Sequence, residues 1–333
     1  MLVTVKPIVI FKLILRRIFH KNAALIHIIM ATKHILVISY SQTGQLDSLV
    51  ENFLVPLRTH SNIEIEQCRI KPQQDYPFPW KFMHFFNQFP ESVHLKPAPI
   101  EPITPIREKY DLVIIAYSVW FLSPAQPITA FLQSPQARCL KDTPVITLIG
   151  CRNMWLMAQE KMKRMLNNLD ARLIANVVKT DQSNDWASFI TTPAWMLSGQ
   201  KRYFSWLPSA GISESELTDM QRFGKKLANT LENSQPLDKT LFSHMGAVKI
   251  DEKLMMSEKV GHRSFYLWGK LLIKCGNISP LLRRIVLYFY IAFLIILILT
   301  VVPLSALIKR LLKPLLKEKL SAQKRYFAEP SGE

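Results

Sequence analysis

Cysteine is scarce in this chain, and the few cysteines present are not arranged for cross-links or metal binding. The 333 residues include only four, with no C-x-x-C pair and no histidine partner at metal-ligand spacing: Cys68, Cys139, Cys151 and Cys275. A disulfide framework and a zinc site are therefore not expected, and no metal ligands are assigned. This cysteine usage is typical of a reducing, cytoplasmic compartment.

The sequence also lacks the glycine-rich signatures of two large nucleotide-binding classes. It contains no Gly-x-Gly-x-x-Gly, and no lysine follows the glycine of its one candidate phosphate loop, residues 41–45. Both the dinucleotide fingerprint and the P-loop require those residues. Their absence argues against both classes.

Acidic residues are few, with 25 Asp and Glu against 42 Lys and Arg, which gives a formal charge of +17. The excess lies at two apolar ends. Residues 1–33 carry six basic and no acidic residues, and residues 270–333 carry eleven basic and three acidic residues. The stretch between them is almost neutral, so the distribution suits an anionic membrane surface, and we expect no nucleic-acid partner.

The rest of the chain is organised around residues 34–46, HILVISYSQTGQL. Ile35 to Ile38 are typical of a short buried strand, and an amphipathic helix is predicted to begin near Leu46. The loop between them is rich in hydroxyls and consists of Ser41, Gln42, Thr43, Gly44 and Gln45. Backbone N–H groups at a helix N-terminus bind phosphate well, although a turn whose Ser and Thr only cap the helix is an alternative.

Strands and helices alternate along the following 190 or so residues. Apolar runs predict further strands at 63–68, 111–117, 144–150 and 171–180, and helical spacing predicts helices at 127–132, 155–169 and 213–231. This alternation indicates an α/β fold with a doubly wound parallel sheet.

Ligands of such sheets bind outside the carboxyl ends of the strands, which brings together the loops 41–45, 118–124 and 150–155. We expect the first loop to hold a phosphate. The other two add the candidate binding residues Ser118, Trp120, Phe121, Gly150 and Cys151 and the hydrogen-bonding residues Arg152 and Asn153. A phosphate site, an aromatic surface and polar groups for a ring edge are what flavin mononucleotide (FMN) needs.

Two of these residues have simpler interpretations. Trp120 is a large aromatic residue that can equally serve core packing. Cys151 is interpreted as a small residue of a tight loop, because no base that would activate it as a nucleophile is identifiable.

Residues 71–105 are rich in proline and aromatic residues and cannot form one regular helix or strand throughout. A section of this length is uncommon in a compact domain and is usually functional. We therefore predict that it covers the site.

Ile285 to Ile308 is a run of 24 residues without a charge, preceded by Arg283-Arg284 and followed by Lys309-Arg310. As a helix it would extend about 36 Å, which exceeds the ~30 Å hydrocarbon core of a bilayer. It is predicted to be a transmembrane or membrane-embedded helix, kinked or divided at Pro303. Because both flanks are basic, a single span and a re-entrant hairpin remain alternatives.

The predicted organisation has four parts. Residues 1–29 form an apolar basic extension, which is either a gene-model extension before a translation start at Met30 or an interfacial helix. Residues 30–235 form the α/β domain, 236–280 a linker or amphipathic region, and 281–322 the membrane anchor and basic tail.

Several stretches together resemble a known bacterial family. They are YSQTGQL at 40–46, YPFPW at 76–80, FPES at 89–92, IGCRNMWLMAQEK at 149–161 and DQSNDWASFITTPAWMLSG at 181–199. Over about residues 32–230 the chain is similar to flavodoxin-like proteins known as dialkylresorcinol condensing enzymes. The loop resembles the flavodoxin pattern aromatic-x-Ser-x-Thr-Gly-x-Thr, from which it departs at Ser39 and Leu46.

The resemblance implies a flavodoxin-like, five-stranded parallel sheet, bound FMN, and a role beside ketosynthases in alkylresorcinol, flexirubin or aryl-polyene synthesis. A ketosynthase or an acyl carrier protein is an expected partner. The residues show no activated cysteine for a condensation. We therefore expect oxidative aromatisation of a cyclohexane-1,3-dione, with the condensing step that the family name implies as the other possibility.

On this interpretation Arg152 and Asn153 are the catalytic residues, which polarise the flavin or the diketone. A channel for a hydrophobic small-molecule substrate is predicted to be lined by Trp80, Phe189, Trp195 and Met196. Membrane lipid is an expected partner, and the expected location is the bacterial inner membrane with the catalytic domain facing the cytoplasm. Two other classes are a membrane-tethered NAD(P)H:quinone oxidoreductase and a non-catalytic flavodoxin-fold scaffold, which Leu46 favours.

Overall fold

The computed structural model describes residues 32–103, 105 and 107–332; within them, the side chains of 185–186 and 301–316 are not described. The predicted N-terminal extension, residues 1–29, lies outside the described residues.

Five parallel strands form the central sheet: β1 (Lys33–Ser39), β2 (Ile63–Arg69), β3 (Leu112–Trp120), β5 (Pro144–Cys151) and β6 (Arg172–Thr180). Their spatial order is β2-β1-β3-β5-β6, and the two-residue β4 (Ser123–Pro124) pairs antiparallel with the end of β3. Ranked along the chain, the parallel strands follow the order 2-1-3-4-5, which is the flavodoxin-like order. The predicted fold class is confirmed, and each predicted strand overlaps an observed one.

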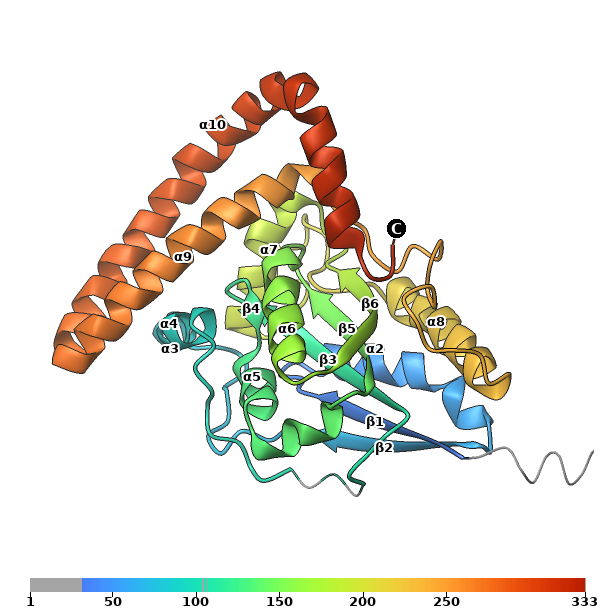
Figure 1. Cartoon of the computed structure of the whole chain (residues 1–333). Helices are drawn as coiled ribbons and strands as arrows, with labels where there is room; N and C mark the ends of the chain where they lie inside the picture. Colours follow the sequence, from blue (N-terminus) through green and yellow to red (C-terminus); the bar gives the residue numbers. More distant parts are fainter. Residues whose placement is uncertain (1–31, 104, 106, 333) are drawn as a thin grey trace, which may run out of the picture.

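Both faces of the sheet are buried, which explains why its strands are continuously apolar. Along β1, Ile35 and Val37 face one core, and Leu36 and Ile38 face the other. Helices α2 (Gln45–Leu54) and α8 (Glu214–Glu232) cover the first face. Helices α5 (Gln126–Leu132) and α6 (Leu156–Asn168) cover the second, as Figure 1 shows.

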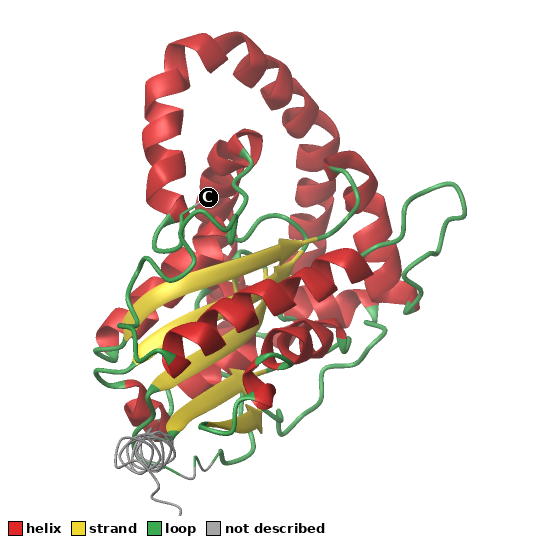
Figure 2. Ribbon diagram, turned by 90° about the vertical axis from the view of Figure 1, so that its right-hand side faces the viewer, coloured by secondary structure: helices red, strands yellow, loops and turns green. Residues whose placement is uncertain are grey.

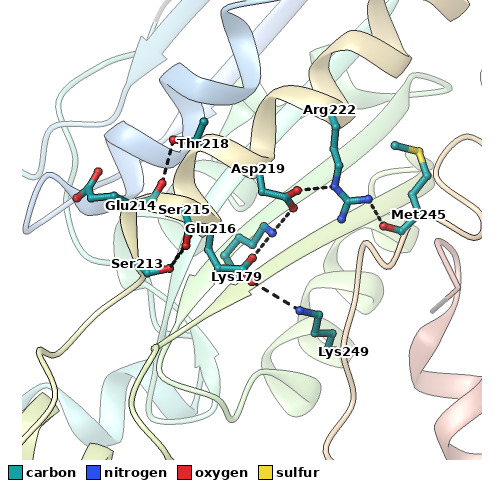
Figure 3. Close-up of polar contacts among 10 residues, drawn as sticks. All are labelled: Lys179, Ser213, Glu214, Ser215, Glu216, Thr218, Asp219, Arg222, Met245 and Lys249. Carbon is teal, nitrogen blue, oxygen red and sulfur yellow. Dashed lines mark hydrogen bonds and ion pairs between the residues drawn. The ribbon is translucent and has the colours of Figure 1, made fainter.

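An ion network fixes α8 to β6 (Figure 3). The buried Lys179 of β6 is ion-paired with Glu216 and, at 2.7 Å, with Asp219, which also binds Arg222 at 2.8 Å. The hydrogen bond from Lys179 lowers the pKa of Glu216. Because its charge is matched by two carboxylates, Lys179 is a structural residue that holds α8 in place.

Two insertions lie at the carboxyl ends of the strands. The first comes from the predicted cover and contains the short helices α3 (Phe82–Asn87) and α4 (Phe89–Val93). The second follows β6 and contains α7 (Asp185–Ser198), whose N-terminus is capped by the Asn184 side chain. The 3-10 turns η1 (Leu57–Thr59) and η2 (Pro135–Leu140) complete the described α/β domain.

The chain ends in two long helices, α9 (Glu252–Ile278) and α10 (Pro280–Ala328), which lie side by side and turn back on one another (Figure 1). The start of α9 is fixed by Met255, which lies in the core beneath the sheet. The end of α10 returns to the same domain. There Phe327 is buried, and the Ser331 hydroxyl accepts from Asn176 N at 2.7 Å and donates to Asn176 O at 2.8 Å.

Among the described residues, one helical segment is long and apolar enough to cross a membrane. It is Pro280–Thr300 in α10, with a mean hydropathy of 2.3. Only 17% of the most apolar window is buried, so most of its apolar surface has no protein partner.

Candidate functional site

The candidate site lies where the strand order reverses. The chain leaves β1 in one direction to form β2 and then crosses to β3 on the other side of β1. The loops that follow β1 and β3 therefore diverge and leave a crevice between them, which is where open α/β sheets bind ligands. The loops after β5 and β6 border the same edge.

The loop after β1 has open hydrogen-bond donors. Gly44 begins α2 in the left-handed conformation with φ of 78°, and no side chain caps the helix. The Ser41 hydroxyl oxygen is buried without a partner at hydrogen-bond distance, although it interacts with the nearby Asp47 carboxyl. Thr43 is exposed and only weakly engaged, at 3.4 Å from Gln45 N. An uncapped helix N-terminus beside the hydroxyls of Ser41 and Thr43 has the chemistry of an anion site.

The carboxyl group of Asp47 opposes the binding of a strongly anionic ligand in this loop. Asp47 lies in the first turn of α2, where burial raises its pKa and the nearby Arg69, 3.8 Å away, opposes that rise. The side-chain amide of Gln45 donates to Ile212 O at 3.3 Å. The donors that this loop offers to an anion are thus the backbone, Ser41 and Thr43.

The cover predicted from residues 71–105 is fastened directly to this loop. Gln42 donates to Pro77 O at 2.9 Å and accepts from the Trp80 indole at 3.1 Å. The backbone N–H of Trp80 donates to Met196 O of α7 at 2.8 Å. Gln42 therefore links the candidate phosphate loop to both insertions.

Beneath this cover lies a cluster of aromatic rings. Trp120 meets Tyr40, Tyr76 and Trp80 edge to face, with centroids 4.9–6.0 Å apart. The Tyr76 hydroxyl donates to Gln126 at 3.1 Å, and burial raises its pKa to about 12. Both interpretations of Trp120 are compatible with this position, because it packs in a cluster and also stands at the switch point.

A strained turn positions the loop after β3. Phe121 and Leu122 have φ of 49° and 56°, which non-glycine residues rarely adopt, and they form the two-residue connection between β3 and β4. Packing holds them there, since the Phe121 ring contacts Phe85 and Phe89. Strain of this kind persists only where surrounding contacts fix the backbone.

The loop after β5 supplies a fixed positive charge. The Arg152 guanidinium lies 3.9 Å above the Phe189 ring centroid and donates to the Ser188 hydroxyl at 3.0 Å. Asn153 is half-buried beside it. Arg152 is thereby oriented by α7 at the carboxyl edge of the sheet.

The other predicted residues of these loops serve packing. Gly150 pairs with Ser118 across β5 and β3, and a Cβ on it would lie 3.2 Å from Leu46. Burial raises the pKa of the Cys151 thiol, and Glu258 raises it further. A thiol with a raised pKa is a poor nucleophile, which agrees with the interpretation of Cys151 as a small loop residue.

The predicted substrate residues fall into two groups joined by α7. Trp80 belongs to the aromatic cluster, and Phe189 lies under Arg152. Trp195 meets Phe78 of the cover edge to face at 6.0 Å, and Met196 provides its carbonyl to Trp80.

Sequence reasoning missed Asp181, which follows β6. Its carboxylate accepts from Ser183 N and Gly211 N at 2.7 Å and from the Thr192 hydroxyl at 3.1 Å. An aspartate directly after a buried strand is a signal that could have identified it. Asp181 fixes the second insertion against the sheet edge.

Comparison with known proteins gives fold-level likeness only. No family model matches the chain, and no curated protein matches it. A flavoprotein of Lactobacillus acidophilus NCFM, solved in complex with FMN, is 16% identical over 44% of this chain and 93% of that chain, with a TM-score of 0.36. A flavodoxin from the domain Archaea is 7% identical over 60% of this chain and 99% of that chain, with a TM-score of 0.33.

General stress protein 14 of Treponema denticola, also solved with FMN, is 7% identical over 60% of this chain and 99% of that chain, with a TM-score of 0.31. With TM-scores this low, these likenesses give no support for the fold beyond the strand order itself. The flavodoxin-like fold therefore rests on the order β2-β1-β3-β5-β6 and on the position of the loops around its switch point.

Proposed function

We propose that this protein is a membrane-associated, FMN-dependent oxidoreductase that oxidises a hydrophobic cyclohexane-1,3-dione to a resorcinol. The observation that carries the proposal is the loop after β1, which stands at the switch point of a flavodoxin-like sheet with an uncapped helix N-terminus and the buried Ser41 hydroxyl beside it. In flavodoxin, a sheet of this strand order binds FMN at that point.

The residues fit FMN better at its phosphate end than at its ring end. The phosphate would lie against Ser41, Thr43 and the N–H groups of Gly44 and Gln45. The ring would lie beside Trp120, in a region where Tyr76 and Trp80 now pack against that side chain. Binding therefore requires the cover to shift, and Gln42 is the residue that ties the cover down.

The reaction removes two hydrogens from the dione, one as a hydride and one as a proton. Bound FMN would supply the hydride acceptor. Arg152, held over Phe189, would attract the developing enolate oxygen, because its charge is fixed before the substrate arrives. Trp195 and Met196 would line the path of the alkyl chain. The condensing activity that the resemblance names has no activated nucleophile among these residues.

Membrane association is the second part of the proposal. The apolar segment Pro280–Thr300 is mostly exposed, as a helix in contact with lipid would be and a core helix would not. A hydrophobic substrate would reach the enzyme from the bilayer. The expected location is the bacterial inner membrane, with the α/β domain in the cytoplasm, where its free cysteines stay reduced.

The test is the visible absorbance spectrum of the full-length protein purified in detergent, with the released chromophore identified by its mass. We expect FMN to be present, or to be taken up when added. The double variant Thr43→Ala/Gly44→Val should lose it, because valine is strained at a φ of 78° and a hydroxyl donor is removed.

The matched control is Gly246→Val. Gly246 is also left-handed, and a Cβ on it would likewise meet nothing within 4 Å, but it lies in the chain between α8 and α9. This variant should keep FMN. Equal retention by both variants, or a colourless wild type that takes up no FMN, would refute the flavin site.

Two alternatives have specific support. A membrane-tethered NAD(P)H:quinone oxidoreductase is favoured by the same exposed helix, because quinones also reside in the bilayer. Rapid bleaching of the flavin by NADH or NADPH would identify it. The second alternative is a scaffold that binds no FMN and associates with a ketosynthase or an acyl carrier protein. Leu46 favours it, because this residue is buried against Gly150 and offers no hydroxyl to a phosphate.

A further inference from the structure

A cavity of about 670 Å³ lies between the first insertion and the paired C-terminal helices, outside the site described above. Its walls come from α3 and α4 on one side and from the end of α9 and the start of α10 on the other. The polar and charged residues that line it include His84, Asn87, Glu91, Lys96, Asn277, Arg283 and Arg284.

The walls of this cavity are held firmly. Arg283 of α10 makes two hydrogen bonds to the Glu91 carboxylate, at 2.7 and 2.8 Å, and a third to Asn87 O at 2.9 Å. Behind them, the rings of Phe89 and Tyr290 stack with centroids 4.5 Å apart. These contacts fix the positions of the first insertion and the helix pair, and so they fix the shape of the cavity between them.

The cavity carries net positive charge. Glu91 is the one acidic residue of its lining, and Arg283 neutralises it. Lys96 and Arg284 also line it, and neither has an ion pair within the part of the chain that the structure describes. Two uncompensated cations beside Asn277 and His84 suit an anionic group with several acceptor oxygens.

The position of this charge relates it to the apolar helix. Arg284 stands in the first turns of α10, and the exposed apolar side chains Leu281, Ile285 and Phe289 surround it along the same helix. Figure 2 shows that α10 arches away from the sheet and that its end returns to it. Because both ends of the helix pair are fixed to one domain, the cavity and the exposed apolar surface lie on a single body.

We propose that this cavity binds the phosphate of an anionic phospholipid head group, while the acyl chains of that lipid lie along the exposed surface of α10. The inference depends on the membrane association proposed above and not on FMN. Head groups and hydrocarbon are adjacent in a bilayer, as Arg284 and the exposed apolar side chains are adjacent on α10; Lys96 of the first insertion lines the same cavity.

Occupancy of the cavity would be felt at the candidate site. His84 lines the cavity and also meets the Trp80 ring edge to face at 5.6 Å. Trp80 in turn holds Gln42 of the loop after β1. A bound head group would therefore contact the cover itself, which must shift to admit FMN.

The experiment is a binding titration of the full-length protein in detergent with mixed micelles of phosphatidylcholine containing phosphatidic acid. The double variant Lys96→Gln/Arg284→Gln should bind these micelles about thirtyfold more weakly than wild type, because each basic residue at a membrane surface contributes about 1 kcal/mol and two are removed. The matched control, Lys225→Gln/Lys226→Gln, removes the same charge from the exposed side of α8 and should bind as wild type does.

Equal losses in the two double variants would show general surface charge and overturn the proposal. A second arm adds free sn-glycerol 3-phosphate, which should compete only weakly; full competition would mean a soluble phosphate ligand and overturn the lipid assignment. Flavin absorbance is recorded on the same preparations. If the protein is free of flavin and the cavity variant alone still binds the phosphatidic acid micelles more weakly, the proposed function is refuted and the lipid site is not.

Discussion

At the scale of single residues, Asp47 is the group that most directly opposes a phosphate in the loop after β1. Its carboxyl interacts with Ser41 in the first turn of α2. We expect Asp47→Asn to tighten FMN binding two- to fivefold, since one charge near a helix N-terminus is worth roughly 0.3–1 kcal/mol. The measurement is a fluorescence titration of the apoprotein with FMN.

Glu51→Gln is the control for this prediction. It removes the same charge one turn further along α2, from a carboxylate that hydrogen bonds hold away from the loop, at 2.6 Å from Arg58 and 3.2 Å from Gln67. Its affinity for FMN should be close to that of wild type. Equal gains in both variants would indicate a long-range charge effect, and a loss in Asp47→Asn would contradict the assigned phosphate position.

Glu258 makes the attachment of α9 sensitive to pH. It is fully buried, one oxygen accepts from Met157 N at 2.7 Å, and the other has no partner among the described residues. Burial raises its pKa to about 8, despite opposing hydrogen bonds from the backbone of Met157 and Leu156. The folded protein therefore holds a proton that the unfolded chain releases above about pH 4.5.

The direction of this pH dependence follows from the linkage between proton binding and folding. Between about pH 4.5 and 8 the folded state binds more protons at Glu258 than the unfolded state does, so this group's stabilisation is lost as the pH rises. We expect the free energy of unfolding by urea, in detergent, to fall with pH in wild type relative to Glu258→Gln, by up to about 1.4 kcal/mol per pH unit.

The comparison between the two proteins removes the contributions of neighbouring groups. Burial also lowers the pKa of Lys161 to about 7 and that of His262 to about 4, and both raise stability with increasing pH over their own ranges. These contributions are common to wild type and Glu258→Gln. Parallel pH profiles for the two proteins would refute a protonated Glu258.

Some residues of the site could be predicted from sequence and others could not. The loop at 41–45 carries its signal locally, because a strand, hydroxyls, a glycine and a helix are consecutive in the chain. The turn at Phe121-Leu122 carries none, since two bulky residues at positive φ contradict local preference and are held by Phe85 and Phe89 from a distant segment.

At the scale of elements, the contact between α2 and α8 sets the position of the loop after β1. Gly224 of α8 lies so close to α2 that a Cβ would be 2.0 Å from Phe53 O. Gly224→Ala forces the helices apart, and we expect it to destabilise the protein by about 1–3 kcal/mol and to weaken FMN retention. Urea unfolding and the flavin content of the purified protein measure the two effects.

Gly261→Ala is the matched control within α9. There a Cβ would meet only Leu122 at 3.6 Å, an ordinary contact distance. Alanine also has the higher helix propensity, so this variant should be neutral or more stable by up to about 1 kcal/mol. The prediction fails if the two substitutions have similar effects.

The strands were predictable as elements because each is a short apolar run with both faces buried. The helices of the insertions were not. Pro193 lies inside α7, against the usual preference, and α3 and α4 are too short to show a period. Helix α9 falls in the region predicted as linker or amphipathic, where Lys, Arg and apolar residues alternate without a long apolar run.

At the scale of the whole molecule, the exposed apolar surface of α10 separates membrane binding from folding. The apolar window of Pro280–Thr300 is 17% buried, while Leu287, Tyr290 and Ile291 on its inner side pack against α4 and α9. Substitutions on the outer side should therefore leave the fold intact.

We expect a variant with five outer residues changed to glutamine to remain folded and to leave the membrane fraction. These residues are each at least 44% exposed: Leu281, Ile285, Phe289, Ile296 and Leu299. Fractionation of cell membranes and flavin content are the measurements, and the wild type should require detergent. The inner-side variant Leu287→Gln/Tyr290→Gln should instead lose stability, because it breaks the stack on Phe89. If the outer variant stays in the membrane fraction, another part of the chain provides the attachment.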